Sequence, residues 1–126
     1  MRYWRESSAE DFRVAELLFE RGYYSQSLFF CHLSVEKLLK ALVMEKTQDY
    51  APYTHDLLRL VEAADVEADE TKNTLLQEMF TFNIAGRYED VKLAFHKKYN
   101  NREIAERWTG HTKDVLQWLN EKFQKE

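Results

Sequence analysis

One stretch of the chain gathers side chains that bind anions and move protons. "NIAGRYEDVKLAFHKKY", from Asn83 to Tyr99, contains one arginine, one histidine, three lysines and two tyrosines. Arginine binds phosphate through two parallel hydrogen bonds, and histidine transfers protons near neutral pH. RNA cleavage without a metal needs a histidine for the proton of the 2′-hydroxyl and an arginine for the charge that builds at phosphorus. Arg87 and His96 are therefore the candidate catalytic pair.

A site that binds without cleaving would use the same stretch. Its candidate nucleotide- or phosphate-binding residues are Arg87, Tyr88, Asp90, Lys92, Lys97 and Tyr99, with His96 as a further phosphate contact. Either tyrosine ring can stack on a base, as aromatic side chains do in single-strand sites. The simpler interpretation is a solvated basic loop in which Arg87 pairs with Glu89 or Asp90, and spacing alone favours it.

The charge distribution points to the same region. The chain has a net charge of −4, which argues against a general nucleic-acid-binding protein. Between Arg87 and Arg107, six basic and four acidic residues give +2, whereas the twelve basic and eighteen acidic residues elsewhere give −6. Any anion site is therefore expected near this segment.

Two other places combine polar residues at helical spacing. In "CHLSVEKLLK", Glu36 precedes Lys40 by four residues, the favourable order for an ion pair on a helix. His32 and Glu36 are also four apart, but two ligands without a third make a weak metal site, so we prefer a polar seam on a buried helix. In "THDLLRL", His55 either contacts an anion or, as we prefer, is a neutral ring bonded to a backbone carbonyl.

The elements that position these residues are helices. One proline, three glycines and apolar residues at three- and four-residue steps predict an all-α fold. We expect a single domain over residues 1–126, an antiparallel up-and-down bundle of about five helices. The first expected helix runs from a capping box at Ser7 to Gly22, and the second covers about Ser25–Lys46. The third is capped by Thr54 and has Asp56 in its first turn. The fourth covers about Thr71–Ile84, and the last starts at Asn100.

Two features of these helices predict association. The helix over about 25–46 is apolar on more than one face, so we expect a homodimer that buries parts of this helix and of the last one. Gly110 lies inside the last helix, where glycine costs about 1 kcal/mol relative to alanine. Either the helix breaks there, or a neighbouring helix or second subunit comes too close for a Cβ atom. The apolar register continues through Trp108, Thr112 and Val115, which favours close approach.

Composition excludes several other classes of site. The single cysteine, Cys31, excludes an internal disulfide and a multi-cysteine zinc site. The sequence shows no charged-then-apolar leader and no apolar run of about 18 residues. We expect a cytoplasmic protein that binds no membrane, metal or cofactor.

Motifs in order along the chain resemble those of the HEPN domain family (higher eukaryotes and prokaryotes nucleotide-binding). "CHLSVEKLLKALVMEK" resembles the second-helix signature of the family, with Glu36, Lys37 and Lys40 in an apolar run. "HDL", which contains His55 and Asp56, resembles the start of its third helix. "GRYED" is similar to the Arg-Tyr-Pro-Asp of the family, with glutamate in place of proline.

The resemblance implies a bundle that dimerises, often beside a small nucleotidyltransferase in a toxin–antitoxin pair. It also implies that toxin members are metal-independent ribonucleases, in which arginine is followed after four to six residues by histidine and then by tyrosine, at a cleft between subunits. Here eight residues separate Arg87 from His96, so the order is kept but the spacing is stretched. Three functions stay open: nucleotide or RNA-phosphate binding with a nucleotidyltransferase partner, which leads; an endoribonuclease using Arg87 and His96; and a helical assembly module.

Overall fold

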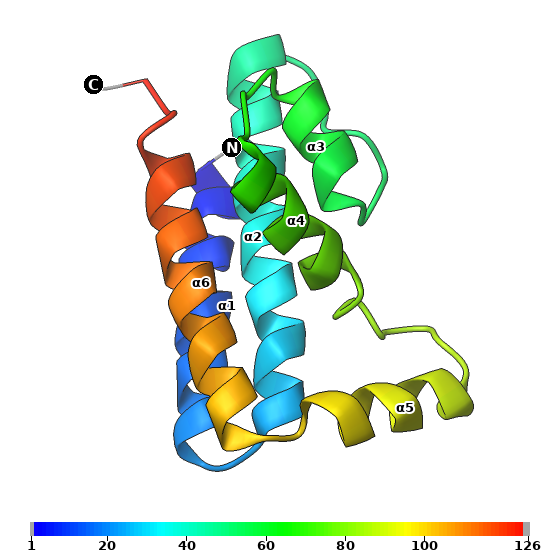
Figure 1. The fold of residues 1–126 in the computed structure, drawn as a ribbon. Coiled ribbons are helices and arrows are strands. Elements are labelled where there is room, and N and C mark those ends of the chain that lie inside the picture. The colour runs from blue at the N-terminus through cyan, green and yellow to red at the C-terminus, as the bar shows by residue number, and fades with distance from the viewer. Residues whose placement is uncertain (1, 125–126) are drawn as a thin grey trace.

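The structure, a computed structural model, describes residues 2–124, and this part of the chain contains six α-helices and no strand. The helices are α1 (Arg2–Glu20), α2 (Tyr24–Thr47), α3 (Leu57–Ala63), α4 (Glu70–Phe80), α5 (Glu89–Tyr99) and α6 (Arg102–Asn120) (Figure 1). The predicted all-α fold is confirmed. There is one helix more than expected because residues 89–99, expected to form a basic loop, form a helix of their own.

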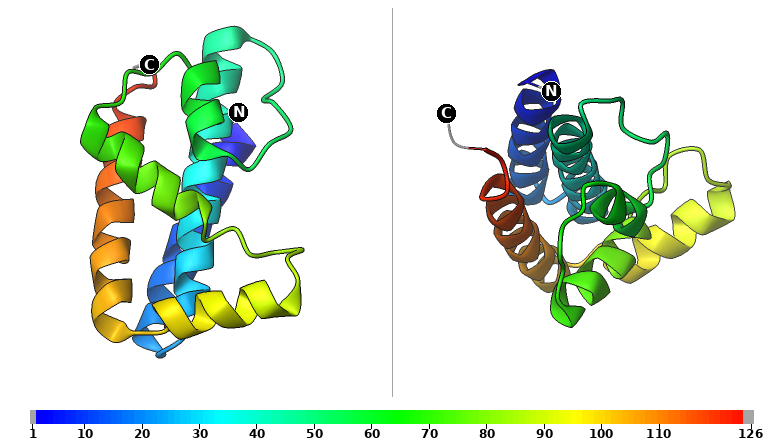
Figure 2. Two further views of the ribbon diagram at one scale, coloured as in Figure 1. Left: turned by 45° about the vertical axis from the view of Figure 1, so that its right-hand side comes forward. Right: turned by 90° about the horizontal axis from the view of Figure 1, so that it is seen from above.

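Helix α2 lies at the centre, with α1 and α6 packed along it, while α4 packs against α3 (Figures 1 and 2). Successive long helices α1, α2, α4 and α6 alternate in direction, which is the expected up-and-down order. The short helix α3 packs near the C-terminal end of α2. At the opposite end of α2, α5 crosses the bundle and extends away from it as an arm.

Burial of α2 explains its apolar residues on several faces. Leu28, Val35, Leu39 and Leu42 are fully buried, because α1, α3 and α6 cover α2 from different sides. The apolar pattern that suggested a dimer is thus largely satisfied within one protomer. The dimer itself remains a prediction.

The start of α1 differs from the sequence-based prediction, whereas its end agrees with it. A helix start at Ser7 was wrong, because α1 already includes Arg2. The Ser7 hydroxyl instead accepts a hydrogen bond from Lys37 Nζ on α2, at 2.8 Å. The prediction that Gly22 ends the helix was correct: its φ of +83° is the left-handed conformation that glycine adopts without strain.

Two other helix caps lie within two residues of their predicted places. Asp56, rather than Thr54, caps α3, and its carboxylate accepts from the N–H of Leu58 at 3.1 Å. Asn101, rather than Asn100, caps α6 in the same way, accepting from Ile104 N–H at 3.1 Å. Both side chains satisfy backbone donors that a helix start leaves free.

Gly110 lies inside an unbroken α6. A Cβ atom built on it would meet no atom of the described chain within 4 Å, apart from its own helix and chain neighbours. The prediction that a neighbouring helix approaches too closely for a side chain was therefore wrong within the protomer. The residue is exposed, and it borders a hollow between α1 and α6.

An aromatic cluster attaches the α5 arm to the bundle. Phe82, fully buried just after α4, lies with its ring centroid 5.9 Å from that of Phe95, and 5.0 Å from those of Tyr99 and Trp108. Aromatic pairs at such distances and edge-on angles stabilise by about 0.5–1.5 kcal/mol each beyond their burial. This cluster holds the C-terminal half of α5 against the bundle, and the N-terminal half projects from it.

Candidate functional site

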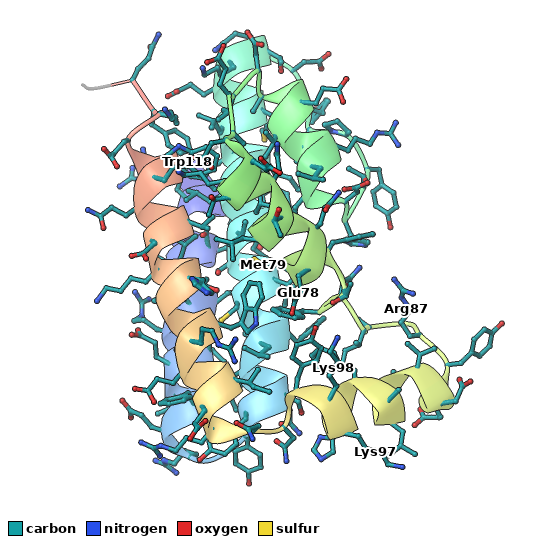
Figure 3. All side chains as sticks on the ribbon, viewed as in Figure 1. Glu78, Met79, Arg87, Lys97, Lys98 and Trp118 are labelled. Atoms are coloured by element: carbon teal, nitrogen blue, oxygen red, sulfur yellow. The ribbon has the colours of Figure 1, made fainter. Side chains whose placement is uncertain are left out.

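The Asn83–Tyr99 stretch divides into an exposed loop and the α5 helix. The loop makes a left-handed turn at Gly86, where φ is +79°. Arg87 and Tyr88 follow at the far end of the arm, and Tyr88 is 84% exposed. The Arg87 side chain extends from this loop into solvent (Figure 3).

Much of the unusual composition serves the α5 helix itself. Its first turn carries Glu89 and Asp90, and its last turn carries His96, Lys97 and Lys98. Negative charge at a helix N-terminus and positive charge at its C-terminus both complement the helix dipole, each by about 0.3–1 kcal/mol. Acidic and basic residues at these positions therefore need no ligand to explain them, whereas Arg87 lies outside the helix and has no such role.

Arg87 does not form the ion pair that the basic-loop interpretation required. In the part of the chain that the structure describes, neither Glu89 nor Asp90 pairs with it. Glu89 instead faces Lys92 one turn later, at 3.8 Å, and the Asp90 carboxylate accepts from the N–H of Val91 at 3.0 Å. The guanidinium is thus exposed and available to an external anion.

The structure does not bring Arg87 and His96 together within one protomer. Helix α5 separates them, and at about 1.5 Å per residue its seven steps from Glu89 to His96 span roughly 10 Å. One nitrogen of the exposed His96 ring also has a partner within the protomer: its Nδ1 lies 2.9 Å from the hydroxyl of Ser25 at the start of α2. This contact, across 71 residues, is one that no sequence pattern signals.

Tyr99 belongs to the core. It is 4% exposed, its ring packs against Phe82 and Phe95, and its hydroxyl donates to Glu78 Oε2 on α4 at 3.0 Å. Its ring faces are therefore not free for a base. Of the two tyrosines predicted to stack, Tyr88 is the accessible one.

The lysines of α5 lie on different sides of the helix. Successive residues of a helix differ by about 100° in direction, so His96 and Lys98 extend to opposite flanks. Figure 3 shows Lys98 on the side that faces α4, where Arg87 also extends, and Lys97 on the other side. Lys92 is half-buried beside Glu89. Lys98, which the sequence did not single out, thus shares a side of α5 with Arg87.

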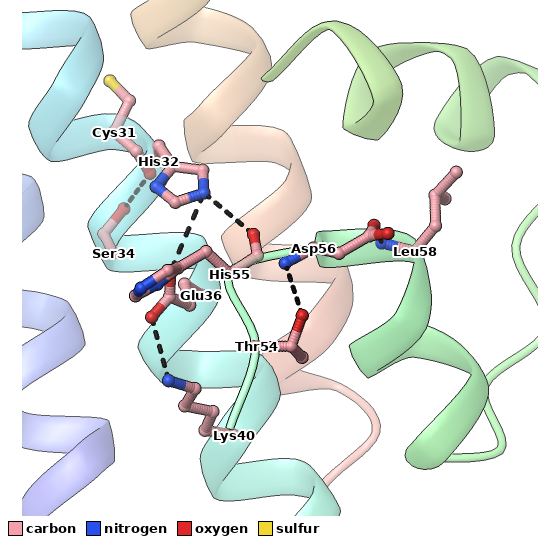
Figure 4. A network of polar contacts seen from close by, with 9 residues as sticks. All are labelled: Cys31, His32, Ser34, Glu36, Lys40, Thr54, His55, Asp56 and Leu58. Atoms are coloured by element: carbon pink, nitrogen blue, oxygen red, sulfur yellow. Dashed lines mark hydrogen bonds and ion pairs between the residues drawn. The ribbon is translucent and has the colours of Figure 1, made fainter. Parts of the chain in front are cut away.

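The second polar group, around Glu36, forms a buried network (Figure 4). Glu36 is 4% exposed, and its two oxygens contact different partners. Oε1 lies 2.9 Å from His55 Nδ1, and Oε2 lies 3.0 Å from Lys40 Nζ. A carboxylate only accepts hydrogen bonds, so both nitrogens donate to it. The predicted Glu36–Lys40 pair is present, and it is largely buried.

The carbonyl contact expected of His55 is made by the other histidine of this network, His32. His55 was expected to bond a backbone carbonyl, but its ring contacts Glu36 instead. The fully buried His32 makes the carbonyl contact: its Nε2 lies 3.2 Å from the carbonyl oxygen of His55 and 3.7 Å from Glu36 Oε1. A carbonyl oxygen only accepts hydrogen bonds, so Nε2 of His32 carries a proton in this contact.

Burial lowers the pKa of His32, and the nearby Glu36 carboxylate opposes that shift only in part. The charged ring would lose its hydration, and its Nδ1 has no hydrogen-bond partner in the described chain. His32 therefore joins helix α2 to the loop before α3 as a neutral donor, not as an acid or base open to a substrate.

Lys37 and Lys40 bind α1 to α2 from the other side of the motif. Lys37 Nζ lies 2.7 Å from Asp11 Oδ2, and Lys40 Nζ lies 5.7 Å from the ring centroid of Trp4. Together with Glu36, His55 and the Asp56 cap, this motif holds three helices in place. Each of these charged side chains has a partner within the fold, so its contacts are structural ones.

Two further classes of site find no support in the described residues. Residues 2–124 contain no group of three or more His, Cys, Asp or Glu side chains arranged to hold a metal ion. Over the same range, every helix is too short or too polar to span a membrane.

Comparison with known proteins agrees with this fold. The chain is similar to the crystal structure of TT1696 from Thermus thermophilus, with a TM-score of 0.80 and 23% identity over 97% of each chain. No curated protein matches it. The family model described as the HEPN domain matches residues 1–122. Because this match covers nearly the whole sequence, the chain belongs to the HEPN domain family.

Proposed function

We propose that this HEPN domain binds a nucleotide or RNA through phosphate at the Arg87 loop, and works with a minimal nucleotidyltransferase partner in a toxin–antitoxin-like pair. The observation that carries the proposal is the exposed Arg87 guanidinium, unpaired by Glu89 or Asp90, beside the 84% exposed ring of Tyr88. A guanidinium fits phosphate bidentately, and a free aromatic ring beside it can take a base.

The other candidate residues take graded roles. Lys98 extends on the same side of α5 as Arg87. Its ammonium group would attract the phosphates of an RNA strand bound along this side of the helix. Lys92 lies between them along the helix, whereas Lys97 faces away and would contact only a ligand that wraps around α5. Asp90 carries a carboxylate, which would accept from a ribose hydroxyl or a base amine, not from phosphate.

The geometry favours binding over cleavage. An endoribonuclease using Arg87 and His96 would need both groups at one phosphate, but in a protomer they lie at different ends of α5. A misplacement of only about 1 Å can cost on the order of 100-fold in rate. RNA cleavage that persists in EDTA and is lost in His96→Ala would establish the enzyme instead.

Binding is tested with a fluorescein-labelled single-stranded RNA and with ATP, followed by anisotropy and thermal shift, since a ligand raises the melting temperature only if it binds the folded state. Arg87→Ala should abolish most of the binding and leave the melting temperature of the free protein unchanged. Arg13→Ala, at an exposed arginine on α1, is the matched control and should bind as the wild type does. Equal binding by both variants would exclude this site.

The partner and the oligomeric state are tested separately. We expect a homodimer by light scattering at tens of micromolar protein, and co-purification with the nucleotidyltransferase encoded beside this chain when the two are co-expressed. A monomeric mass would contradict the predicted dimer, and failure to co-purify would contradict the predicted partner. Neither result would bear on the Arg87 site.

A further inference from the structure

A groove runs between α1 and α6, which both pack on α2. Two adjoining hollows, of about 290 and 410 Å³, share Phe12 and together make up this α1–α6 groove. The half near the start of α6 is lined by Phe12, Glu16, Phe19, Glu20, Glu106 and Gly110 among others. The other half has an apolar floor that includes Ala9, Leu38 and Leu116.

Contacts between α1 and α6 close the groove at both ends. At one end, Arg5 donates to Asn120 Oδ1 at 3.2 Å and lies with its Cζ 4.1 Å from the Phe123 ring centroid. At the other, Arg102 Cζ lies 5.4 Å from the ring centroid of Phe19. The helical rise from Arg5 to Phe19 gives the groove a length of about 21 Å. This is the length of a helix of about 14 residues.

The half near the start of α6 has the chemistry of a cation site. Glu16, Glu20 and Glu106 are exposed around two half-buried aromatic rings. None of the three forms an ion pair with a basic side chain in residues 2–124. Lys113 is the one basic residue among its lining residues. Aromatic faces and carboxylates together attract Arg and Lys side chains, and Arg102 already occupies one face of Phe19 in this way.

Gly110 lines this half of the groove from the α6 side. Within residues 2–124, no contact requires a glycine there, since a Cβ atom would meet no neighbour within 4 Å outside its own helix. Glycine nevertheless costs the helix about 1 kcal/mol relative to alanine. An arriving helix that approaches the α6 backbone closely would account for this cost.

We propose that the α1–α6 groove docks an amphipathic helix of another protein, with Arg or Lys side chains beside Glu16, Glu20 and Glu106 and an apolar stripe along Phe12, Leu38 and Leu116. Charge complementarity favours a basic partner over a second copy of this acidic chain, whose net charge is −4. Apolar anchors at helical spacing are the usual way in which a groove binds a helix. Helices α1 and α6 lie on one side of α2 and the α5 arm extends on the other (Figure 2), so this surface is separate from the proposed phosphate site.

The probe is a synthetic 14-residue helical peptide with a leucine stripe flanked by arginines, and its counterpart has glutamate for every arginine. We expect the arginine peptide to bind at least about tenfold more tightly by fluorescence anisotropy. Glu16→Gln, Glu20→Gln and Glu106→Gln combined should weaken it about tenfold. The control combines Glu10→Gln, Glu103→Gln and Glu121→Gln, the same charge change outside the groove, and should bind as the wild type does.

Gly110→Met separates blocked binding from loss of the fold. Methionine is a better helix former than glycine and fills the groove, so peptide binding should be lost without a lower melting temperature. Gln117→Met, exposed on α6 and outside the lining residues, should keep binding. Equal affinity for both peptides, or unchanged binding by Gly110→Met, would overturn the proposal. A dimer that Gly110→Met converts to a monomer would also overturn it, because a second copy would then occupy the groove.

Discussion

The Nδ1 atom of His55 lies 2.9 Å from Oε1 of Glu36, and this contact ties the loop before α3 to the middle of α2. The other oxygen of the same carboxylate holds Lys40, whose side chain is only 12% exposed. One glutamate thus organises a histidine from a distant loop and a lysine one turn away. Glu36, Lys40 and His55 therefore form a structural joint between α2 and the loop before α3.

The first prediction follows from this joint. Glu36→Ala should lower the free energy of unfolding by about 3–5 kcal/mol, because it leaves the buried Lys40 ammonium without its counter-ion. Urea denaturation measures the change. Adding Lys40→Met to Glu36→Ala removes the uncompensated charge and should recover much of the loss. A cost under about 1 kcal/mol for Glu36→Ala would mean that the network is solvated and contributes little.

The second prediction concerns pH. The pKa of His32 is lower in the folded protein than its ordinary value of 6.5, so the unfolded chain binds more protons at mildly acidic pH. The stability that neutral His32 contributes is complete above about pH 6.5 and is lost as the pH falls through the lowered folded-state pKa. Melting temperatures measured from pH 7.5 to 5 should therefore fall less steeply in His32→Gln than in the wild type. Parallel curves would show that another group causes the decline.

The third prediction concerns Cys31, which is fully buried. Burial raises the pKa of its thiol to about 12, against a hydrogen bond from Thr112 that lowers it. The thiolate is the reactive form of cysteine, so a thiol reagent at pH 8 should not label the native protein and should label it fully in urea. Rapid labelling without urea would mean that α2 opens readily around this residue.

The fourth prediction reverses the one drawn from sequence. Gly110→Ala should raise the melting temperature, because alanine stabilises an open helix position by about 0.4–1 kcal/mol and the Cβ atom meets no neighbour. Differential scanning calorimetry of the isolated protein decides the sign. A lower melting temperature that depends on protein concentration would place a second subunit against Gly110.

Local signals predicted the fold well. Apolar spacing placed α2 to within one residue at each end, and Gly22 ended α1 as expected. The helix start predicted at Ser7 was wrong because a capping box reports only on neighbouring residues. Contacts of Trp4 and Arg5 with residues far along the chain stabilise an earlier start of α1. Helix α5 was missed because its charged ends resemble a basic loop.

The candidate site was less predictable, because it depends on contacts between distant residues. The pairs Ser25–His96 and Glu78–Tyr99 span 71 and 21 residues, and they decide which side chains of the stretch are occupied. No spacing rule within a helix reports such pairs. The sequence named Tyr88 and Tyr99 equally as stacking candidates, and only the fold separates the 84% exposed Tyr88 from the 4% exposed Tyr99.

The most direct test of phosphate binding at Arg87 is the salt dependence of RNA affinity. Each phosphate contact releases counterions, so a plot of log K against log salt for a single strand has a slope of about −0.7 per contact. Measured by anisotropy from 50 to 300 mM KCl, the wild type should show a negative slope. Arg87→Ala should make that slope shallower by about 0.7 and weaken binding, while Arg13→Ala changes neither. A slope and affinity unchanged by Arg87→Ala would contradict the account.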